Sequence, residues 1–275
     1  MRQNSPTLIS EALTIIRGGG DLATGIAYRL HQAGFPLIVL ELPQPLVVRR
    51  RVALASAVME GAVTVENLRG RLVPDLAAAY EMAPTGIIPV LVLPELPPAH
   101  VAAIIVDARM AKQNIDTGRD QADLVIGLGP GFTAGVDCHA VIETKRGHRL
   151  GRVIWQGAAL PDSGTPGIIA GKAAERVIRA PVGGIVHWQR AIGDRVAAGD
   201  LLGSVDGQPL FAAFDGVLRG LIAPETAVPP HLKIGDLDPR ADREACFTIS
   251  DKALAIGGGV LEAILTYWQW QRGWA

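Results

Sequence analysis

Three consecutive glycines, Gly18–Gly20, constrain the fold of this chain more than any other stretch. The apolar run at residues 13–16 predicts a strand before them, and apolar residues at positions 22, 26, 30 and 33 recur at helical spacing after them. A second apolar run, at residues 37–40, ends at Glu41. The sequence therefore predicts a strand, a tight turn, a helix and a second strand. In this unit Gly18-x-Gly20-x-x-Ala23 matches the dinucleotide-binding fingerprint with alanine in the third position.

The residues of this predicted turn suit a nucleotide chemically. Glycines let the backbone approach a pyrophosphate, towards which the first N–H groups of the helix point. A carboxylate at Glu41 can accept a hydrogen bond from a ribose 2′-OH. Asp21 can belong to the same site or simply complement the helix dipole, and a purely structural turn is the alternative. The expected cofactor is NAD or a related nucleotide, and the candidate binding residues here are Gly18, Gly19, Gly20, Asp21 and Glu41.

Composition excludes several classes of protein. A length of 275 residues allows one or two domains, and a hydrophobic content of 49% supports a sizeable core. The net charge of −1 lacks the excess of positive charge that is typical of nucleic-acid-binding proteins, so we expect no nucleic-acid partner. The first ten residues lack a secretory apolar core, and no apolar run is long enough to cross a membrane, so we expect a cytoplasmic protein without a membrane partner. The two cysteines match no zinc spacing, and no metal site is expected.

Further apolar runs extend the predicted sheet. They are continuous rather than alternating, as is typical of parallel strands buried on both faces, and they cover residues 87–93, 102–106 and 124–128. Ligands bind at the carboxyl ends of such strands. Asp107 and Lys112 follow one run and are candidate catalytic residues, as an acid–base or charge-clamp pair, or else an ordinary salt bridge. Gly129 and Gly131 follow the next run and are candidate cofactor-binding residues, or else a plain turn.

Three other polar groups are weaker candidates. Cys138 and His139 are adjacent in a predicted strand, so their side chains point to opposite faces and do not serve one centre easily. We expect Cys138 to be a packing residue and His148 to be a polar loop residue. The arginines at 49–51 either clamp an anion or form a solvated helix face.

A different pattern begins near residue 176. Residues 180–186 and 212–218 share Ala-x-x-x-Gly-apolar-apolar, and a hairpin signal stands between them at Asp206-Gly207. Together with Ile192-Gly193-Asp194-Arg195-Val196-Ala197-Ala198-Gly199-Asp200, this resembles the lipoyl/biotinyl-like barrel-sandwich hybrid. Carrier domains of that type present a lysine at the central hairpin, whereas no lysine occurs here between Lys172 and Lys233. We therefore expect a structural or interaction module without carrier chemistry.

The chain then returns to helical character. Gly257–Gly259 is expected to open a helix that continues through Trp268, and the tryptophan-rich tail is expected to pack on the first domain or on a second subunit. The predicted fold is α/β, with a Rossmann-like, mostly parallel sheet and an inserted small all-β module. The predicted domains are 1–175 for nucleotide binding, 176–235 for the β module, and 236–275 for a segment that packs back.

Five stretches carry a resemblance over nearly the whole chain, at residues 16–23, 125–133, 141–151, 233–240 and 257–265. Together they resemble the selenium-dependent molybdenum hydroxylase system proteins. The resemblance implies a cytoplasmic accessory protein linked to maturation of molybdenum hydroxylases such as xanthine dehydrogenase. It also implies partners among these hydroxylases or their maturation factors. Molybdopterin dinucleotide, which carries a pyrophosphate, joins NAD as a candidate cofactor.

Three functions follow from these observations. The first is an accessory or maturation protein that binds a nucleotide or a nucleotide-bearing cofactor. The second is an NAD(P)-dependent oxidoreductase, which needs a proton donor, for which Asp107, Lys112 and His139 are the candidates. The third is a non-catalytic scaffold. Fold alone does not decide among them, and the sequence leaves open whether the chain catalyses a reaction.

Overall fold

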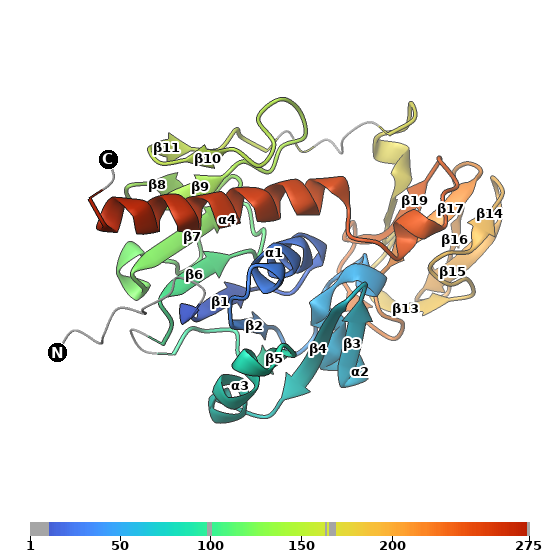
Figure 1. The fold of residues 1–275 in the computed structure, drawn as a ribbon. Helices are drawn as coiled ribbons and strands as arrows, with labels where there is room; N and C mark the ends of the chain where they lie inside the picture. The colour runs from blue at the N-terminus through green and yellow to red at the C-terminus, as the bar shows by residue number, and fades with distance from the viewer. Residues whose placement is uncertain (1–10, 98–100, 163, 165–168, 274–275) are drawn as a thin grey trace. The chain divides into compact units, whose positions relative to one another are not determined.

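The computed structural model describes residues 11–97, 101–162, 164 and 169–273. The chain divides into two compact units, each coloured along the sequence in Figure 1. The first, here called the sheet unit, comprises Met1–Pro45, Leu54–Asp162 and Ile249–Ala275. The second, here called the β unit, comprises Leu46–Ala53 and Ser163–Thr248. Each unit is therefore assembled from segments that are distant in sequence.

A nine-stranded sheet forms the centre of the sheet unit, in the order β10-β9-β7-β6-β1-β2-β5-β4-β3. All neighbouring pairs are parallel except those of the two edge strands, β10 and β3. This confirms the predicted α/β fold with a mostly parallel sheet. The strands are β1 (Thr14–Arg17), β2 (Leu37–Glu41), β3 (Ala62–Val65), β4 (Leu68–Val73), β5 (Ile88–Val92), β6 (Ile104–Asp107), β7 (Leu124–Leu128), β9 (Ala140–Ile142) and β10 (Val153–Ile154).

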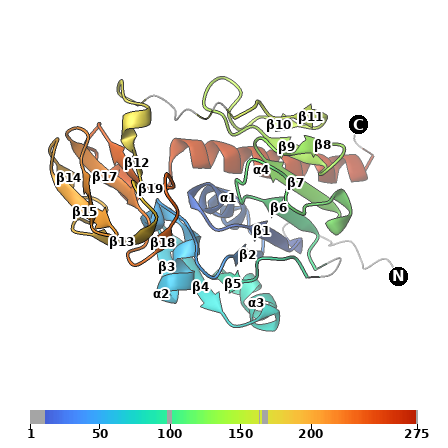
Figure 2. The ribbon, with the colours of Figure 1, turned by 180° about the vertical axis from the view of Figure 1, so that it is seen from behind.

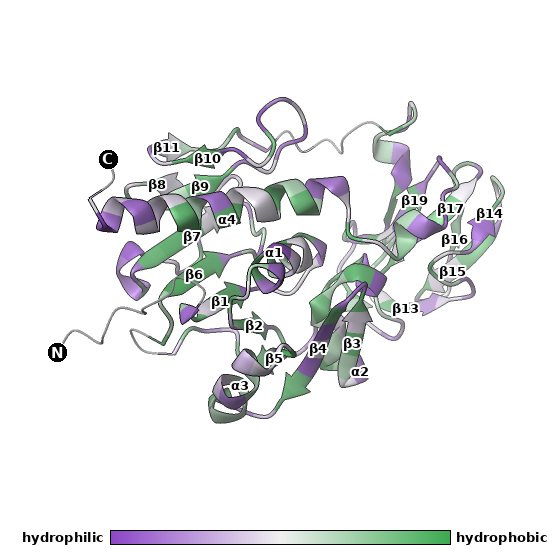
Figure 3. Cartoon of the chain, viewed as in Figure 1, coloured by the Kyte–Doolittle hydropathy of each residue, from purple (hydrophilic) through white to green (hydrophobic). Residues whose placement is uncertain are grey.

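The central strands are buried along their whole length, as their continuous apolar runs predict. Every residue of β1, β2, β6 and β7 is buried, and these strands are largely hydrophobic in Figure 3. Successive side chains point to opposite faces, and one core cluster gathers Ile15, Ile105 and Val125 with Ala79 and Phe132. A small ribbon of β8 (Thr133–Ala134) and β11 (Gly157–Ala158) adjoins the sheet.

Two helices lie side by side over the sheet. The α-helices of the sheet unit are α1 (Asp21–Gln32), α2 (Ala57–Glu60), α3 (Leu76–Met82) and α4 (Asp251–Gln271). Short 3-10 turns are η3 (Leu54–Ser56), η4 (Ala83–Thr85) and η5 (Arg119–Gln121). Helix α4 contacts α1 and the strands β7, β9 and β10, and Figures 1 and 2 show it alongside α1 on one face of the sheet.

The expectation that Gly257–Gly259 opens the last helix is wrong. Helix α4 begins at Asp251, after Ser250 as its N-cap, whose Oγ accepts from the N–H of Ala253 at 3.2 Å. The glycines lie inside the helix because α1 and α4 approach each other closely. A Cβ added at Gly25 of α1 would come within 2.5 Å of the Ala253 carbonyl, and one at Gly257 would overlap the carbonyl oxygen of Gly25. The tryptophan-rich end packs within the sheet unit, where Trp270 lies 4.3 Å from Trp155 between ring centroids.

The β unit consists of two four-stranded antiparallel sheets, ordered β12-β19-β17-β14 and β16-β15-β13-β18. Hairpin β15–β16 turns at Asp206 (φ +49°) and Gly207 (φ +82°), which confirms the hairpin signal. The strands are β12 (Val177–Arg179), β13 (Gly184–Trp188), β14 (Arg195–Val196), β15 (Leu201–Val205), β16 (Gln208–Phe211), β17 (Gly216–Leu221), β18 (Ala227–Val228) and β19 (Lys233–Asp238). The 3-10 turns are η2 (Arg50–Val52), η6 (Ala174–Arg176) and η7 (Glu244–Cys246).

The two small sheets enclose one apolar core. Val186, Leu202, Val217 and Leu237 are among its fully buried members. Strand β19 pairs with β12 and β17, so this unit continues past residue 235. No helix in the described part of the chain is long and apolar enough to cross a membrane.

Candidate functional site

Strand β1 marks the point where the order of the sheet reverses. It pairs in parallel with β2 on one side and with β6 on the other, and Arg17 lies opposite Leu40 and Asp107. In open parallel sheets the crevice at such a switch point is where ligands bind. The topology therefore brings the β1–α1 glycine turn, the end of β2 and the end of β6 to one edge.

The glycine turn is shaped by close approach of the backbone. Gly18 adopts φ +89° and donates its N–H to the carbonyl of Leu40 at 2.7 Å, while a Cβ there would meet the backbone of Arg109 at 3.1 Å. Gly20 is the N-cap of α1 with φ −65° and ψ −177°. Because it has no side chain, the first turn of α1 has no side-chain cap, and Asp21 is the acidic residue of that turn.

Glu41 lies directly against the glycine turn. Its Oε2 accepts from the N–H of Gly19 at 2.7 Å, and its Oε1 accepts from the N–H of Leu42 at 2.7 Å. The residue is 8% exposed. Each carboxylate oxygen has two lone pairs, so a hydroxyl donor can still be accommodated. The structure thus brings together Gly19 and Glu41, which the sequence places 22 residues apart.

Asp107 and Lys112 have different partners. Asp107, at 1% exposure, accepts from Arg109 at 2.6 Å and from the hydroxyl of Thr117 at 2.6 Å. Lys112 instead forms an exposed ion pair with Asp162 at 2.5 Å. The buried carboxylate therefore fixes the loop after β6, and the lysine extends from the same loop towards another segment.

Arg17 joins the Asp107 cluster from the end of β1. Its buried guanidinium donates to Asp116 at 2.9 Å and to Thr117 at 3.0 Å. The hydrogen bond from Arg17 lowers the pKa of Asp116 to about 2, and Arg109 acts in the same direction. Our sequence analysis missed Arg17, Arg109, Asp116 and Thr117. The sequence signal that could have revealed this cluster is Arg17 itself, which lies between a predicted buried strand and a glycine. A buried guanidinium requires a polar partner.

The second glycine loop lies beside the Lys112 segment. A Cβ at Gly131 (φ +108°) would come 2.6 Å from the backbone of Gln113, and one at Gly129 (φ +68°) would overlap Thr144. Strands β7 and β1 are separated only by β6, which puts their carboxyl ends about 10 Å apart. Gly129 and Gly131 are therefore explained by close packing, on the same edge as the first glycine turn.

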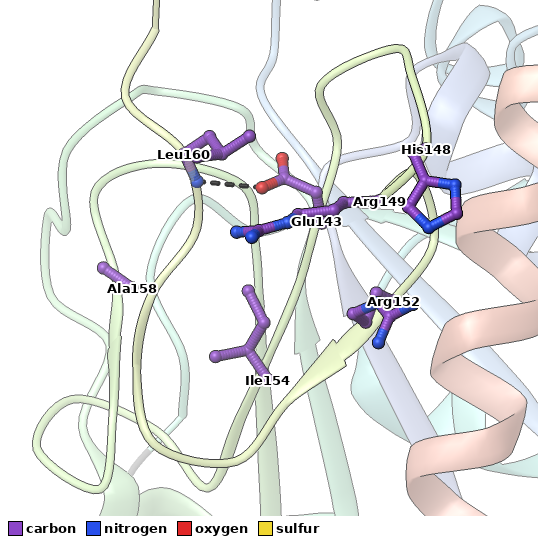
Figure 4. A pocket seen from close by; sticks show the side chains of 7 residues that line it. All are labelled: Glu143, His148, Arg149, Arg152, Ile154, Ala158 and Leu160. Atoms are coloured by element: carbon purple, nitrogen blue, oxygen red, sulfur yellow. Dashed lines mark hydrogen bonds between the residues drawn. The ribbon is translucent and has the colours of Figure 1, made fainter.

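A cavity of about 320 Å³ opens at the carboxyl end of β9 (Figure 4). Glu143, which is 1% exposed, accepts from the N–H of Lys145 at 2.7 Å and from that of Leu160 at 2.8 Å. His148, expected to be a loop residue, lies at this cavity, and our sequence analysis missed most of the others. The lining residues are Glu143, His148, Arg149, Arg152, Ile154, Ala158 and Leu160.

Lys252 adds a positive group from the first turn of α4. Burial lowers its pKa, and the negative charges of Asp21, Glu143 and Asp162 act in the opposite direction. These charges come from the start of α1, the end of β9 and the segment after β11. The start of α4 thus belongs to the same edge of the sheet as the candidate site.

The side chains of Cys138 and His139 are engaged in packing and in a backbone hydrogen bond, respectively. Cys138 is fully buried, and burial raises the pKa of its thiol to about 11. The Nδ1 of His139 accepts from the N–H of Val125 at 3.0 Å, and burial lowers the pKa of its imidazole. No group of three or more potential metal-ligating side chains occurs among the described residues.

We expect neither cysteine to react with a thiol reagent in the folded protein at pH 8. Cys138 and Cys246 are both buried, with raised pKa values. With a pKa of about 11, roughly one Cys138 thiol in a thousand is ionised at pH 8. A colorimetric thiol titration should count no thiol in native protein and both after denaturation. Rapid native reaction of one thiol would show that its site opens.

No protein-family model matches this chain. The chain is homologous to the uncharacterized protein YqeB of Escherichia coli (strain K12), with 48% identity over 259 residues. The alignment covers 92% of this chain and 47% of that protein, so the chain spans about half the length of the curated relative it matches.

Solved structures show little similarity. An aspartoacylase family protein from Mesorhizobium loti matches 23% of this chain and 23% of its own, at 17% identity and a TM-score of 0.22. The ectoine utilization protein EutE of Ruegeria pomeroyi matches 83% of this chain and 86% of its own, at 13% identity and a TM-score of 0.24. Neither match bears on function.

Proposed function

We propose that the sheet unit binds a nucleotide, NAD or a dinucleotide-bearing cofactor, at the β1–α1 turn. The supporting observation is the contact between Glu41 and Gly19 at the switch point of the sheet, beside a helix start that has no side-chain cap. The pyrophosphate would accept from the N–H groups that begin α1. The ribose would donate a hydroxyl to Glu41, whose negative charge would repel a 2′-phosphate.

We further propose that this binding serves the maturation of molybdenum hydroxylases. The support is the resemblance of five stretches of the chain to accessory proteins of that system. Molybdopterin dinucleotide offers the same pyrophosphate to the turn as NAD does. In this function the chain would hold or present the cofactor, and its partners would be a hydroxylase or other maturation factors.

Gly20→Ser tests the nucleotide site. The backbone of Gly20 already has the extended conformation of an N-cap, so the serine hydroxyl would satisfy an N–H of the first turn and stabilise the fold by about 0.3 kcal/mol. It would also compete with a phosphate for that N–H. In calorimetric titrations we expect NAD to bind wild type more tightly than NADP does, and to bind Gly20→Ser at least about tenfold more weakly.

A control variant and a measurement in cells distinguish loss of NAD binding from loss of folding. Gly258→Ala changes an open position of α4, and we expect it to leave NAD affinity unchanged. In a strain lacking this protein, wild type should restore xanthine dehydrogenase activity and Gly20→Ser should not. Equal NAD binding by wild type and Gly20→Ser would reject the site, and tighter binding of NADP would reject the role of Glu41.

A further inference from the structure

The cavity at the end of β9 contains positive charge without partners. Arg149, Arg152 and His148 line it, and no side-chain hydrogen bond or ion pair of these three occurs within the described residues. Two arginines elsewhere in the sheet unit have acidic partners, since Arg17 pairs with Asp116 and Arg146 with Asp251. Two unpaired guanidinium groups at one cavity leave its charge unbalanced.

The one acid of the cavity is held by the backbone. Both oxygens of Glu143 accept N–H groups, from Lys145 and Leu160, which fix the carboxylate in place, and no described residue forms an ion pair with it. Figure 4 shows Arg149 extending across the cavity near Glu143, with Ile154 and Ala158 further along the wall. The remaining lone pairs of the carboxylate can accept a hydrogen bond from a ligand.

We propose that this cavity, here called the arginine pocket, binds a small phosphomonoester that carries a hydroxyl group. Planar guanidinium groups match a phosphate with paired hydrogen bonds. A phosphomonoester carries a charge of about −1.5 to −2 at neutral pH, which is attracted to Arg149 and Arg152. Its hydroxyl donates to Glu143, and its short carbon skeleton contacts Ile154 and Ala158. The volume of about 320 Å³ is at the lower end of ligand sites, which fits a small molecule.

The arginine pocket is separate from the proposed nucleotide site. Its lining residues all lie between 143 and 160, after β9. Strand β9 is three places from β1 in the sheet, which corresponds to about 14 Å between strand axes. The proposal therefore stands whether or not the glycine turn binds a nucleotide.

Calorimetric titration with glycerol 3-phosphate, at low and at physiological ionic strength, tests the proposal. We expect saturable binding by wild type and a Kd at least about tenfold higher for Arg149→Gln and for Arg152→Gln. Arg146→Gln is the matched control, because it removes the same charge from the same segment but does not line the cavity. We expect its Kd to stay within about twofold of wild type.

Two further comparisons complete the test. Methyl phosphate lacks the hydroxyl and should bind about tenfold more weakly than glycerol 3-phosphate, because it makes no hydrogen bond to Glu143. Gly20→Ser should bind glycerol 3-phosphate as wild type does. The proposal is overturned if wild type shows no saturable binding, if Arg146→Gln loses as much affinity as Arg149→Gln, if methyl phosphate binds equally well, or if Gly20→Ser weakens binding.

Discussion

Replacing Gly257 by alanine will lower the free energy of unfolding by about 3 kcal/mol, whereas the same replacement at Gly258 will raise it. A Cβ at Gly257 would overlap the carbonyl oxygen of Gly25, which is backbone and cannot rotate away. Helices α1 and α4 would have to separate. At Gly258 a Cβ would meet nothing within 4 Å, and alanine favours a helix over glycine by about 1 kcal/mol.

Urea unfolding followed by circular dichroism measures both effects. The two variants change adjacent residues of one helix by the same single carbon, so each is the control for the other. Similar stability of the two variants would show that α1 and α4 do not pack through Gly25 and Gly257.

Removing the carboxylate of Asp107 should lower the free energy of unfolding nearly as much as Gly257→Ala does. In Asp107→Ala, Arg109 and Thr117 lose a buried acceptor, although Arg109 keeps its ion pair with Asp116, and leaving such donors unsatisfied costs about 1–3 kcal/mol. Lys112→Ala removes only an exposed ion pair, with 59% and 39% of the two side chains accessible, and should cost at most about 1 kcal/mol.

Thermal unfolding of both variants, compared with wild type, decides between two roles for Asp107. A large loss for Asp107→Ala and a small one for Lys112→Ala would assign Asp107 to the architecture of the switch point. If Asp107→Ala and Lys112→Ala have similar melting temperatures, the Asp107 cluster does not stabilise the fold. That result would favour the interpretation of Asp107 as a catalytic acid.

The parallel sheet was predictable because burial on both faces leaves a local signature. Continuous apolar runs marked β2 and β7, and the glycine turn fixed where β1 ends. The hairpin at Asp206-Gly207 was predictable for the same local reason, since two consecutive positive φ angles require such residues. The start of α4 was not predictable. Glycine has a low helix propensity, and its place inside α4 is explained only by contact with Gly25, which is more than 200 residues away in the sequence.

The candidate site was predictable only in part. Glycines and an acid at fixed spacing indicated that Gly19 and Glu41 belong together. The partners of Asp107 and the lining of the arginine pocket depend on side chains that meet across loops, and no spacing encodes those contacts. Glu143 illustrates this, because its two backbone donors, Lys145 and Leu160, come from different sides of a loop.

The most direct test of the central claim is a titration of ¹⁵N-labelled protein with NAD, followed by backbone amide chemical shifts. Binding at the switch point predicts saturable shifts at Gly19, Gly20 and the first turn of α1, together with a shift at Leu42 when Glu41 engages the ribose. The amides of the β unit should stay unchanged. Absence of shifts at Gly19 and Gly20 at millimolar NAD, or saturable shifts confined to other segments, would contradict the account.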